Sequence, residues 1–433
     1  MQATDHAPMN SLHDSLLVEN YSGTRQSMRV AVVTETYPPE VNGVALTVDR
    51  LVRGLQERNH DVQLVRPRQA RADACATAAA AGDDSGLQLV LTRGLPIPRY
   101  PHLRMGLPSK RALLSLWTRQ RPDIVHLATE GPLGWSALQA ARKLKLPISS
   151  DFRTNFHAYS RHYGIGWLQK PIAAYLRKFH NLAHCTMVPT PGLQAELAAI
   201  GFQRLLVVAR GVETQRFSPL CRSEALRASW GVQPDDPVVL SVGRLAAEKN
   251  LPLLAHAYHA MREVNPRTKL VVVGDGPERE ALRSLCPQAV LAGARSGHEL
   301  AQHYASADVF LFPSLTETYG NVTPEAMASG LAVLAFNYAA AAELINHGSN
   351  GLLVPFGDEA AFVRRAADLA ANPVLLARLR AGARDSTLAL DWNRIVGQVE
   401  NVWLHLRQLH AAGPDALYAD WTSGLTLPGV SSA

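Results

Sequence analysis

The chain has 433 residues, of which 47% are hydrophobic and 18% are charged, so a largely disordered chain is excluded and two or three domains are expected. Its net charge of +6 is unevenly distributed, because residues 28–208 carry +11 whereas residues 209–390 carry −1. A basic first half indicates an anionic partner, such as a membrane surface or a nucleic acid, and it is equally consistent with a solvated basic face.

The two ends of the chain and one internal stretch are predicted to be irregular. Residues 1–27 lack the apolar run of a signal peptide and, like the Gly/Pro/Ser-rich residues 412–433, are expected to be disordered. The Ala-rich residues 70–86 are expected to form a variable loop. No apolar run is long enough to predict a membrane-spanning helix, and four scattered cysteines without a C-x-x-C pair are typical of a cytoplasmic protein.

In the first half, short β-branched apolar runs alternate with longer amphipathic segments. Continuous apolar strands separated by helices predict a parallel sheet covered on both faces. The predicted elements in chain order are strand 28–33, helix 44–58, strands 61–65 and 87–91, helix 110–119, strand 123–127, helix 135–144, and strands 186–188 and 205–208.

The same alternation restarts near residue 210, which predicts a second doubly wound α/β domain over residues 209–390 after a first over 28–208. The predicted elements are strand 238–242, helix 251–264, strand 270–273, a helix from 277, strand 290–291, helix 297–305, strand 309–312, helix 323–329, strands 332–335 and 352–354, and mostly helix from 359 to 409. Ligands of such sheets bind beyond the carboxyl ends of the strands, so the cleft between the domains is the expected site.

The strongest motif follows predicted strand 309–312 and holds Glu317 and Glu325 with seven residues between them. Pro324 suits the first turn of a helix, which would leave the amides of residues 320–323 unpaired at its N-terminus and free to bind a phosphate. Two carboxylates beside an anion site indicate acceptors for sugar and ribose hydroxyls. The alternative is that Glu325 is a first-turn acid that complements the helix dipole.

Arg244 and Lys249 follow predicted strand 238–242, where they could clamp a diphosphate, the arginine as a fork and the lysine as a point charge. The alternative is a surface ion pair between Glu248 and Lys249. Gly43 opens a predicted helix and would let a phosphate approach backbone amides, although a plain strand–helix turn is also consistent with it.

Gly274 begins a G-x-G sequence after a predicted strand, but Arg279 occupies the third glycine position of a dinucleotide fingerprint. This excludes an NAD-linked oxidoreductase and indicates a tight turn near a nucleotide. No P-loop, H-E-x-x-H, G-x-S-x-G or Asp-x-Asp motif is present, and the 16 histidines do not cluster as metal ligands do. A sugar-nucleotide epimerase and a non-catalytic sugar-nucleotide binding protein share the two-domain shape, and they stay open as alternatives.

Together these motifs resemble the retaining glycosyltransferases of family 4, which have the GT-B fold, over about residues 28–409. Residues 317–330 are similar to the E-x7-E signature of that family, Arg244 and Lys249 to its diphosphate pair, and Gly43 to its glycine loop. Residues 28–43, 151–164 and 210–213 look most similar to the GDP-mannose-dependent α-mannosyltransferases and the sulfoquinovosyltransferases.

The resemblance implies two Rossmann-like domains facing across a cleft, an acceptor domain followed by a nucleotide-sugar domain, with helix 391–411 packing back on the first. It implies that Arg244 and Lys249 neutralise the leaving diphosphate and that Glu317 holds hydroxyls of the donor sugar. It implies nucleotide-binding roles for a further set of residues: Gly43, Gly274, Asn321, Val322, Glu325 and Arg210. No metal and no other cofactor are expected beside the nucleotide-sugar donor.

One position departs from the family. Where relatives usually carry a histidine that contacts the reacting sugar, this chain has Arg153, which could bind an anionic group instead. His126 or His157 could then take the role of the missing histidine. The expected catalytic residues are therefore Arg244, Lys249, Glu317, Arg153 and His126.

The resemblance implies transfer of a hexosyl group to a lipid or glycan hydroxyl, with mannosyl from GDP-mannose favoured and a glucosyl, galactosyl or sulfoquinovosyl group from a UDP-sugar as the alternative. Residues 99–121 and 161–178 mix Arg and Lys with Leu, Trp and Tyr. Such a surface could rest on an anionic leaflet, so a peripheral location on the inner face of the cell membrane is expected and a nucleic-acid partner is not.

Overall fold

The computed structural model describes residues 27–40, 42–69, 86–97, 100–153, 169–317, 319–413 and 416–417. The extensions predicted at 1–27 and 412–433, the loop predicted at 70–86, and His157 lie wholly or almost wholly outside the described residues.

The first domain is built on a seven-stranded sheet with the order β3-β2-β1-β6-β7-β8-β9, in which every pairing is parallel. Apart from the edge strand β3, its strands are buried along most of their length because helices cover both faces, and this burial explains their continuous apolar runs. The strands are β1 Arg29–Val33, β2 Asp61–Pro67, β3 Leu87–Thr92, β6 Ile124–Leu127, β7 Ile148–Asp151, β8 Cys185–Val188 and β9 Leu205–Val207.

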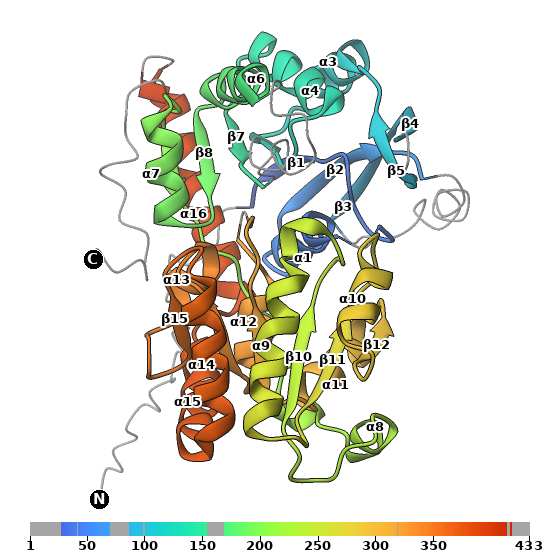
Figure 1. Ribbon diagram of the computed structural model, residues 1–433. Helices are drawn as coiled ribbons and strands as arrows, with labels where there is room; N and C mark the ends of the chain where they lie inside the picture. The colour runs from blue at the N-terminus through green and yellow to red at the C-terminus, as the bar shows by residue number, and fades with distance from the viewer. Residues whose placement is uncertain are drawn as a thin grey trace, which may run out of the picture.

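The helices of the first domain are α1 Gly43–Gln56, α3 Lys110–Arg119, α4 Pro132–Lys143, α6 Gln169–Asn181 and α7 Pro191–Ala199. A small antiparallel hairpin, β4 Gly94–Ile97 and β5 Tyr100–Gly106, lies beside the sheet (Figure 1). Helix α1 begins at Gly43 because the Asn42 side chain caps it, accepting a hydrogen bond from the Ala45 amide at 2.8 Å.

The second domain repeats the architecture with a six-stranded parallel sheet of order β12-β11-β10-β13-β14-β15 (Figure 1). Its strands are β10 Val238–Val242, β11 Lys269–Val273, β12 Val290–Gly293, β13 Val309–Phe312, β14 Ala332–Phe336 and β15 Leu352–Val354. Its helices are α8 Glu224–Ser229, α9 Leu251–Val264, α10 Arg279–Leu285, α11 Gly297–Ala305, α12 Val322–Ala328, α13 Ala339–Leu344, α14 Glu359–Ala371 and α15 Pro373–Thr387. The predicted fold of two doubly wound α/β domains is confirmed.

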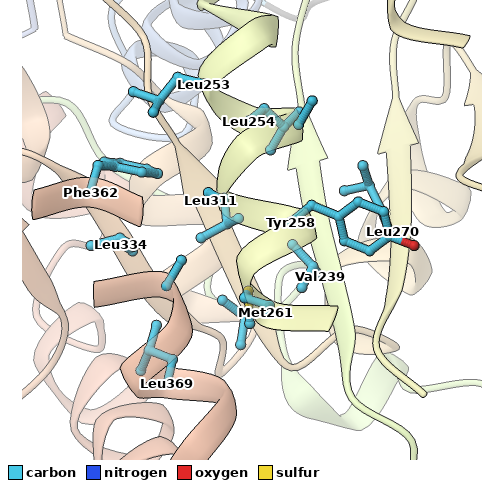
Figure 2. Packing of buried hydrophobic residues seen from close by; sticks show 14 of the residues in the cluster. Val239, Leu253, Leu254, Tyr258, Met261, Leu270, Leu311, Leu334, Phe362 and Leu369 are labelled. Carbon is cyan, nitrogen blue, oxygen red and sulfur yellow. The ribbon is translucent and has the colours of Figure 1, made fainter. Parts of the chain in front are cut away.

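One of the two hydrophobic cores of the second domain lies between its sheet and the helices α9 and α14 (Figure 2). Leu254 on α9, Leu334 on β14 and Phe362 on α14 come from segments far apart in the sequence, and none of them is exposed. Leu254→Ala is expected to lower the free energy of unfolding by about 2–5 kcal/mol, since the cavity that it leaves cannot fully collapse.

Denaturant unfolding followed by circular dichroism measures this loss. The control is Leu220→Ala, because the Leu220 side chain is 95% exposed and its removal is expected to cost less than about 0.5 kcal/mol. Equal losses in the two variants would contradict the described packing.

The last long helix, α16 Trp392–Ala412, leaves the second domain and packs on the first (Figure 1). Its buried side chains, among them Val399 and Trp403, belong to the core that contains β1 and α1. Gly54 of α1 allows a close approach, because a Cβ there would lie 2.6 Å from a methyl carbon of Val396. The two domains are thus joined twice, near residue 210 and through α16.

Some elements were not predicted from the sequence: the strand β7, the helices α6, α7 and α8, and the hairpin. In β7 the pattern Ile-Ser-Ser-Asp is too polar for a buried strand, but Ser149 and Ser150 are buried with their hydroxyls hydrogen-bonded to histidines. The helix expected from Pro277 begins later, at Arg279, because the Glu278 amide donates to the Leu245 carbonyl and holds the turn open.

Candidate active site

The carboxyl ends of the central strands of both sheets, where the predicted catalytic residues lie, face the gap between the domains. Gly43 at the start of α1 lies against Asn321 before α12, and a Cβ on Gly43 would lie 3.4 Å from Asn321 Nδ2. Arg210 of the connection between the domains donates to Asn321 Oδ1 at 3.4 Å. The structure therefore brings together three of the predicted nucleotide-binding residues from different parts of the chain.

The second domain supplies a lysine–glutamate pair at the ends of the adjacent strands β10 and β13. Lys249 Nζ forms an ion pair with Glu317, and Ser314 Oγ donates to the same carboxylate oxygen at 2.8 Å. The two side chains are 17% and 13% exposed, so both are fixed and largely desolvated, yet each keeps some access to the cleft. The alternative of a surface pair between Glu248 and Lys249 is wrong.

Arg244 follows β10 and forms an ion pair with Glu248, whose side chain is buried. Because 41% of the Arg244 side chain is exposed, its guanidinium can exchange this partner for an anion in the cleft. A lysine held by Glu317 and an arginine held by Glu248 thus stand beside each other at the end of one strand.

Gly274 has a structural function in this arrangement. Its φ is +141°, and a Cβ on it would lie 1.8 Å from the Gly243 carbonyl oxygen, so only glycine lets the loops after β10 and β11 touch. Its amide donates to the Gly293 carbonyl at 2.9 Å. Gly274 therefore allows the loops after β10 and β11 to lie against each other, and its amide already has a hydrogen-bond partner.

The segment before α12 is less open than the sequence suggests. The prediction that the amides of residues 320–323 are all unpaired is wrong at Thr323, whose amide donates to the Gly320 carbonyl at 3.0 Å. Gly320 has a φ of +90°, which turns the chain into the helix. For Asn321 and Val322, phosphate binding stays a prediction.

Glu325 on α12 lines a cavity of about 160 Å³ between the domains. Leu46, Thr47 and Arg50 of α1 form one wall, and Arg295 and Ser296 before α11 form another. Burial raises the pKa of Glu325 to about 7, against the opposing effect of the Tyr304 hydroxyl, which donates to its carboxylate at 2.9 Å. The cavity is deep enough to hold a polar group that donates hydrogen bonds to a carboxylate.

Arg153 and Arg210 meet over Asp151 at the end of β7. Arg153 forms an ion pair with Asp151, and His126 Nε2 lies 3.3 Å from the same carboxylate. Burial alone would raise the pKa of Asp151, but Arg153, His126 and Arg210 outweigh it and hold this pKa below the usual range. Burial and the charge of Arg153 lower the pKa of Arg210 to about 10.

His126 reaches the site only through Asp151. Its side chain is 0% exposed and lies beneath the carboxylate, with its ring centroid 5.2 Å from that of Trp403. His126 therefore cannot touch a sugar directly in this conformation, because Asp151 lies between its imidazole and the cleft.

Several residues of the site were not assigned roles from the sequence: Asp151, Tyr304, Tyr319, Arg295 and Ser314. Asp151 belongs to the quoted segment 151–164, but the strand that ends at it, β7, was not predicted, so its place at the cleft was not apparent from the sequence. Tyr319 supports the connection between the domains, because its ring lies 5.6 Å beneath the Arg210 guanidinium and its hydroxyl donates to the Arg210 carbonyl at 3.3 Å.

The described residues hold no group of three or more His, Cys, Asp or Glu side chains that could bind a metal ion. The charged groups that the site itself presents are fixed cations and carboxylates. Two cations at the end of β10 can bind a diphosphate, and two carboxylates can accept from hydroxyls, which is the arrangement that a sugar nucleotide requires.

Residues 236–372 match the family described as glycosyl transferases group 1, and residues 41–216 match glycosyltransferase family 4. The chain is 35% identical to a GDP-mannose-dependent alpha-mannosyltransferase of Mycobacterium tuberculosis, over 87% of this chain and 97% of the relative. It is 29% identical to the sulfoquinovosyl transferase SQD2 of Arabidopsis thaliana, over 89% of this chain and 76% of the relative.

Among solved structures, sucrose-phosphate synthase from Thermosynechococcus elongatus superposes with a TM-score of 0.71 at 20% identity, covering 89% of this chain and all of that one. HepE from Anabaena, solved with UDP and glucose, superposes with a TM-score of 0.66 at 18% identity, covering 87% of this chain and 100% of that one. These likenesses establish the GT-B fold. With the sequence matches above, they show that the chain belongs to the group 1 and family 4 glycosyltransferases and is a glycosyltransferase enzyme.

Proposed function

We propose that this enzyme transfers a mannosyl group from GDP-mannose to a hydroxyl of a lipid or glycan acceptor, with retention of the anomeric configuration. The observation that carries the proposal is the set of relatives named GDP-mannose-dependent alpha-mannosyltransferase, which are 34–35% identical and include one matched over 100% of its length. The Lys249–Glu317 pair at the cleft supplies the chemistry.

In the proposed reaction, the bond between the anomeric carbon and the diphosphate oxygen breaks while the acceptor oxygen bonds to the same face. The departing phosphate oxygen takes the acceptor proton. Arg244 and Lys249 offset the charge that develops on the leaving diphosphate, and Glu317 accepts from hydroxyls of the sugar. Because these two cations neutralise the leaving group, we propose that no metal is needed.

The alternative donor is a UDP-sugar, and the similarity to the sulfoquinovosyl transferase SQD2 of Arabidopsis thaliana favours a sugar other than mannose. Thermal unfolding with GDP, UDP and ADP in parallel separates the donors. A nucleotide at about 100 times its Kd stabilises the protein by about 2.7 kcal/mol, which raises Tm by several degrees.

We expect a shift with GDP alone. A product assay by mass spectrometry with GDP-mannose and UDP-glucose completes the test, and turnover of UDP-glucose alone would overturn the proposed donor.

Glu325 is proposed to accept from the ribose hydroxyls, which requires its ionised form. Since the pKa of Glu325 is raised to about 7, protonation below pH 7 is expected to weaken nucleotide binding. GDP affinity measured by calorimetry at pH 6 and pH 8 is expected to fall by about fivefold at the lower pH beyond the change seen in Glu325→Gln. The variant is the control because titration of the diphosphate itself affects both proteins equally, and equal pH dependence would contradict the role.

The raised pKa of Glu325 also affects the unliganded protein. The contribution to folding is fully present below the unfolded pKa near 4.5 and is lost as the pH rises through about 7, because the folded state disfavours the ionised carboxylate. Ionisation of Glu325 is therefore expected to favour nucleotide binding and to disfavour folding.

Exposed basic side chains on the helices α3 and α6 support a lipid acceptor. Lys110, Arg111 and Arg119 of α3, and Lys170, Arg177 and Lys178 of α6, are exposed. Tyr175 between them is 41% exposed. None of the described helices is long and apolar enough to cross a membrane, so contact with a bilayer would be at its surface.

Flotation with vesicles that contain about a third phosphatidylglycerol is expected to carry the protein upward at low salt and to lose it at high salt, since each basic residue contributes electrostatically. Neutral vesicles are the control. Absence of flotation at low salt would contradict peripheral association with an anionic membrane.

A further inference from the structure

A chain of buried polar groups connects the C-terminal helix α16 to the site. Trp403 Nε1 on α16 donates to Ser149 Oγ on β7 at 2.8 Å, and Ser149 Oγ lies 3.0 Å from His126 Nδ1 on β6. His126 Nε2 in turn lies 3.3 Å from Asp151 Oδ2. None of Trp403, Ser149 and His126 is exposed, so no water competes for the hydrogen bonds that Ser149 makes with Trp403 and His126. The contact of His126 Nε2 with Asp151 is a close charge contact, because Nε2 has no partner in hydrogen-bond geometry among the described residues.

The direction of the hydrogen bonds follows from the donors that each group owns. An indole has one N–H and accepts nothing, so the Ser149 oxygen accepts from Trp403 and its hydroxyl proton remains to be donated. If His126 Nδ1 also carried a proton, the buried Ser149 hydroxyl would have no acceptor in this network, which is costly. Ser149 therefore donates to Nδ1, and the imidazole proton stands on Nε2, facing Asp151.

Asp151 links this network of buried polar groups to the arginines at the cleft. Its carboxylate pairs with Arg153 and attracts Arg210, which donates to Asn321 beside the start of α1. An imidazole with its proton on Nδ1 would present a lone pair to the Asp151 carboxylate and repel it. The position of both guanidinium groups thus depends on which nitrogen of a buried histidine carries the proton.

We propose that Trp403 and Ser149 are positioning residues for glycosyl transfer, which hold His126 in its Nε2-protonated form so that Asp151 fixes Arg153 and Arg210 at the reacting sugar and diphosphate. The proposal rests on the roles proposed above for the site residues and does not depend on the donor's identity. It assigns α16 a part in catalysis besides its packing, because this helix supplies Trp403, the first donor of the hydrogen-bond network.

The chain offers a matched control for the packing of Trp403. Trp117 on α3 is also 0% exposed in the first domain, but its Nε1 has no hydrogen-bond partner in the part of the chain that the structure describes. Trp403→Phe and Trp117→Phe each replace a buried indole with a smaller ring, and only Trp403→Phe removes a donor from the hydrogen-bond network. Ser149→Ala removes the middle member with little change in volume.

Turnover is measured well below the Tm of each variant, with the folded fraction checked by circular dichroism. Trp403→Phe and Ser149→Ala are expected to lower kcat by about five- to tenfold, the effect of losing one buried hydrogen bond, with a smaller change in KM for the donor. Trp117→Phe is expected to stay within twofold of wild type. His126→Gln, whose amide can still donate to Asp151, is expected to retain at least fivefold more turnover than His126→Leu.

A second readout does not use activity. Nitrogen-15 NMR of histidine-labelled protein, assigned by comparison with His126→Gln, is expected to place the His126 proton on Nε2 in the wild type and on a mixture of nitrogens in Trp403→Phe. A proton on Nδ1 in the wild type, or turnover within twofold of wild type in both Trp403→Phe and Ser149→Ala, would overturn the proposal.

If the wild type does not use GDP-mannose, the proposed donor is wrong. The same variants are then compared with the nucleotide sugar that it does use, so the two failures are told apart.

Discussion

Replacing Glu317 with alanine is expected to lower kcat by about 10²–10³-fold while the Kd for the nucleoside diphosphate changes by less than about threefold. The reason lies in what the carboxylate contacts. Glu317 is held by Lys249 and Ser314, and its main-chain carbonyl accepts from the Tyr338 hydroxyl at 2.9 Å, so it stands in one orientation toward the cleft. A side chain that holds the sugar acts on the transition state, and positioning groups of this kind contribute effects of this size.

Steady-state kinetics with the donor and calorimetry with the nucleoside diphosphate measure the two quantities separately. Glu263→Ala is the control, since it removes an exposed carboxylate from α9 in the same domain and is expected to leave both unchanged. Loss of nucleotide affinity in parallel with kcat would contradict a role confined to the sugar.

The sequence was sufficient to predict that several of the candidate residues follow the carboxyl ends of strands. Arg244 and Lys249 follow β10, and Glu317 follows β13, and the two strands pair in parallel. Each residue was predicted to follow a strand, but their pairing was not predicted, because it depends on β10 and β13 being neighbours that end at the same edge of the sheet. The same argument about strand ends applies to Gly43, which follows β1 of the first domain, and to Asn321, which follows β13 of the second.

Other relationships could not be read from the chain. Trp403 and Ser149 are 254 residues apart, and nothing in the local pattern of either residue indicates the other. The strand β7 was missed because serines replace apolar residues at positions that histidines from β6 and α6 satisfy. A single sequence shows which residues carry charge, whereas the partner of a charge can come from a distant strand, as Glu317 does for Lys249.

Replacing Lys249 with alanine is expected to have the larger effect of the two, lowering kcat/KM by about 10³-fold or more and weakening binding of the nucleoside diphosphate as well. The ammonium group serves two purposes in this structure, because it neutralises the Glu317 carboxylate and lies at the end of β10 where the diphosphate is proposed to leave. Its loss leaves a largely buried carboxylate unpaired beside two phosphates, and the repulsion adds to the lost attraction.

Lys249→Arg keeps the charge but replaces a compact ammonium with a longer fork, so partial activity is expected. Lys269→Ala is the matched control, because Lys269 stands at the opposite end of β11, away from the cleft.

The double variant Lys249→Ala/Glu317→Ala is expected to bind the nucleoside diphosphate more tightly than Lys249→Ala alone, since the unpaired carboxylate is then absent, although its turnover stays low. Calorimetry on the four members of this cycle measures the coupling. Strictly additive effects on diphosphate binding would show that the lysine and the glutamate act independently, and would contradict a site in which one ion pair joins the sugar contact to the leaving-group contact.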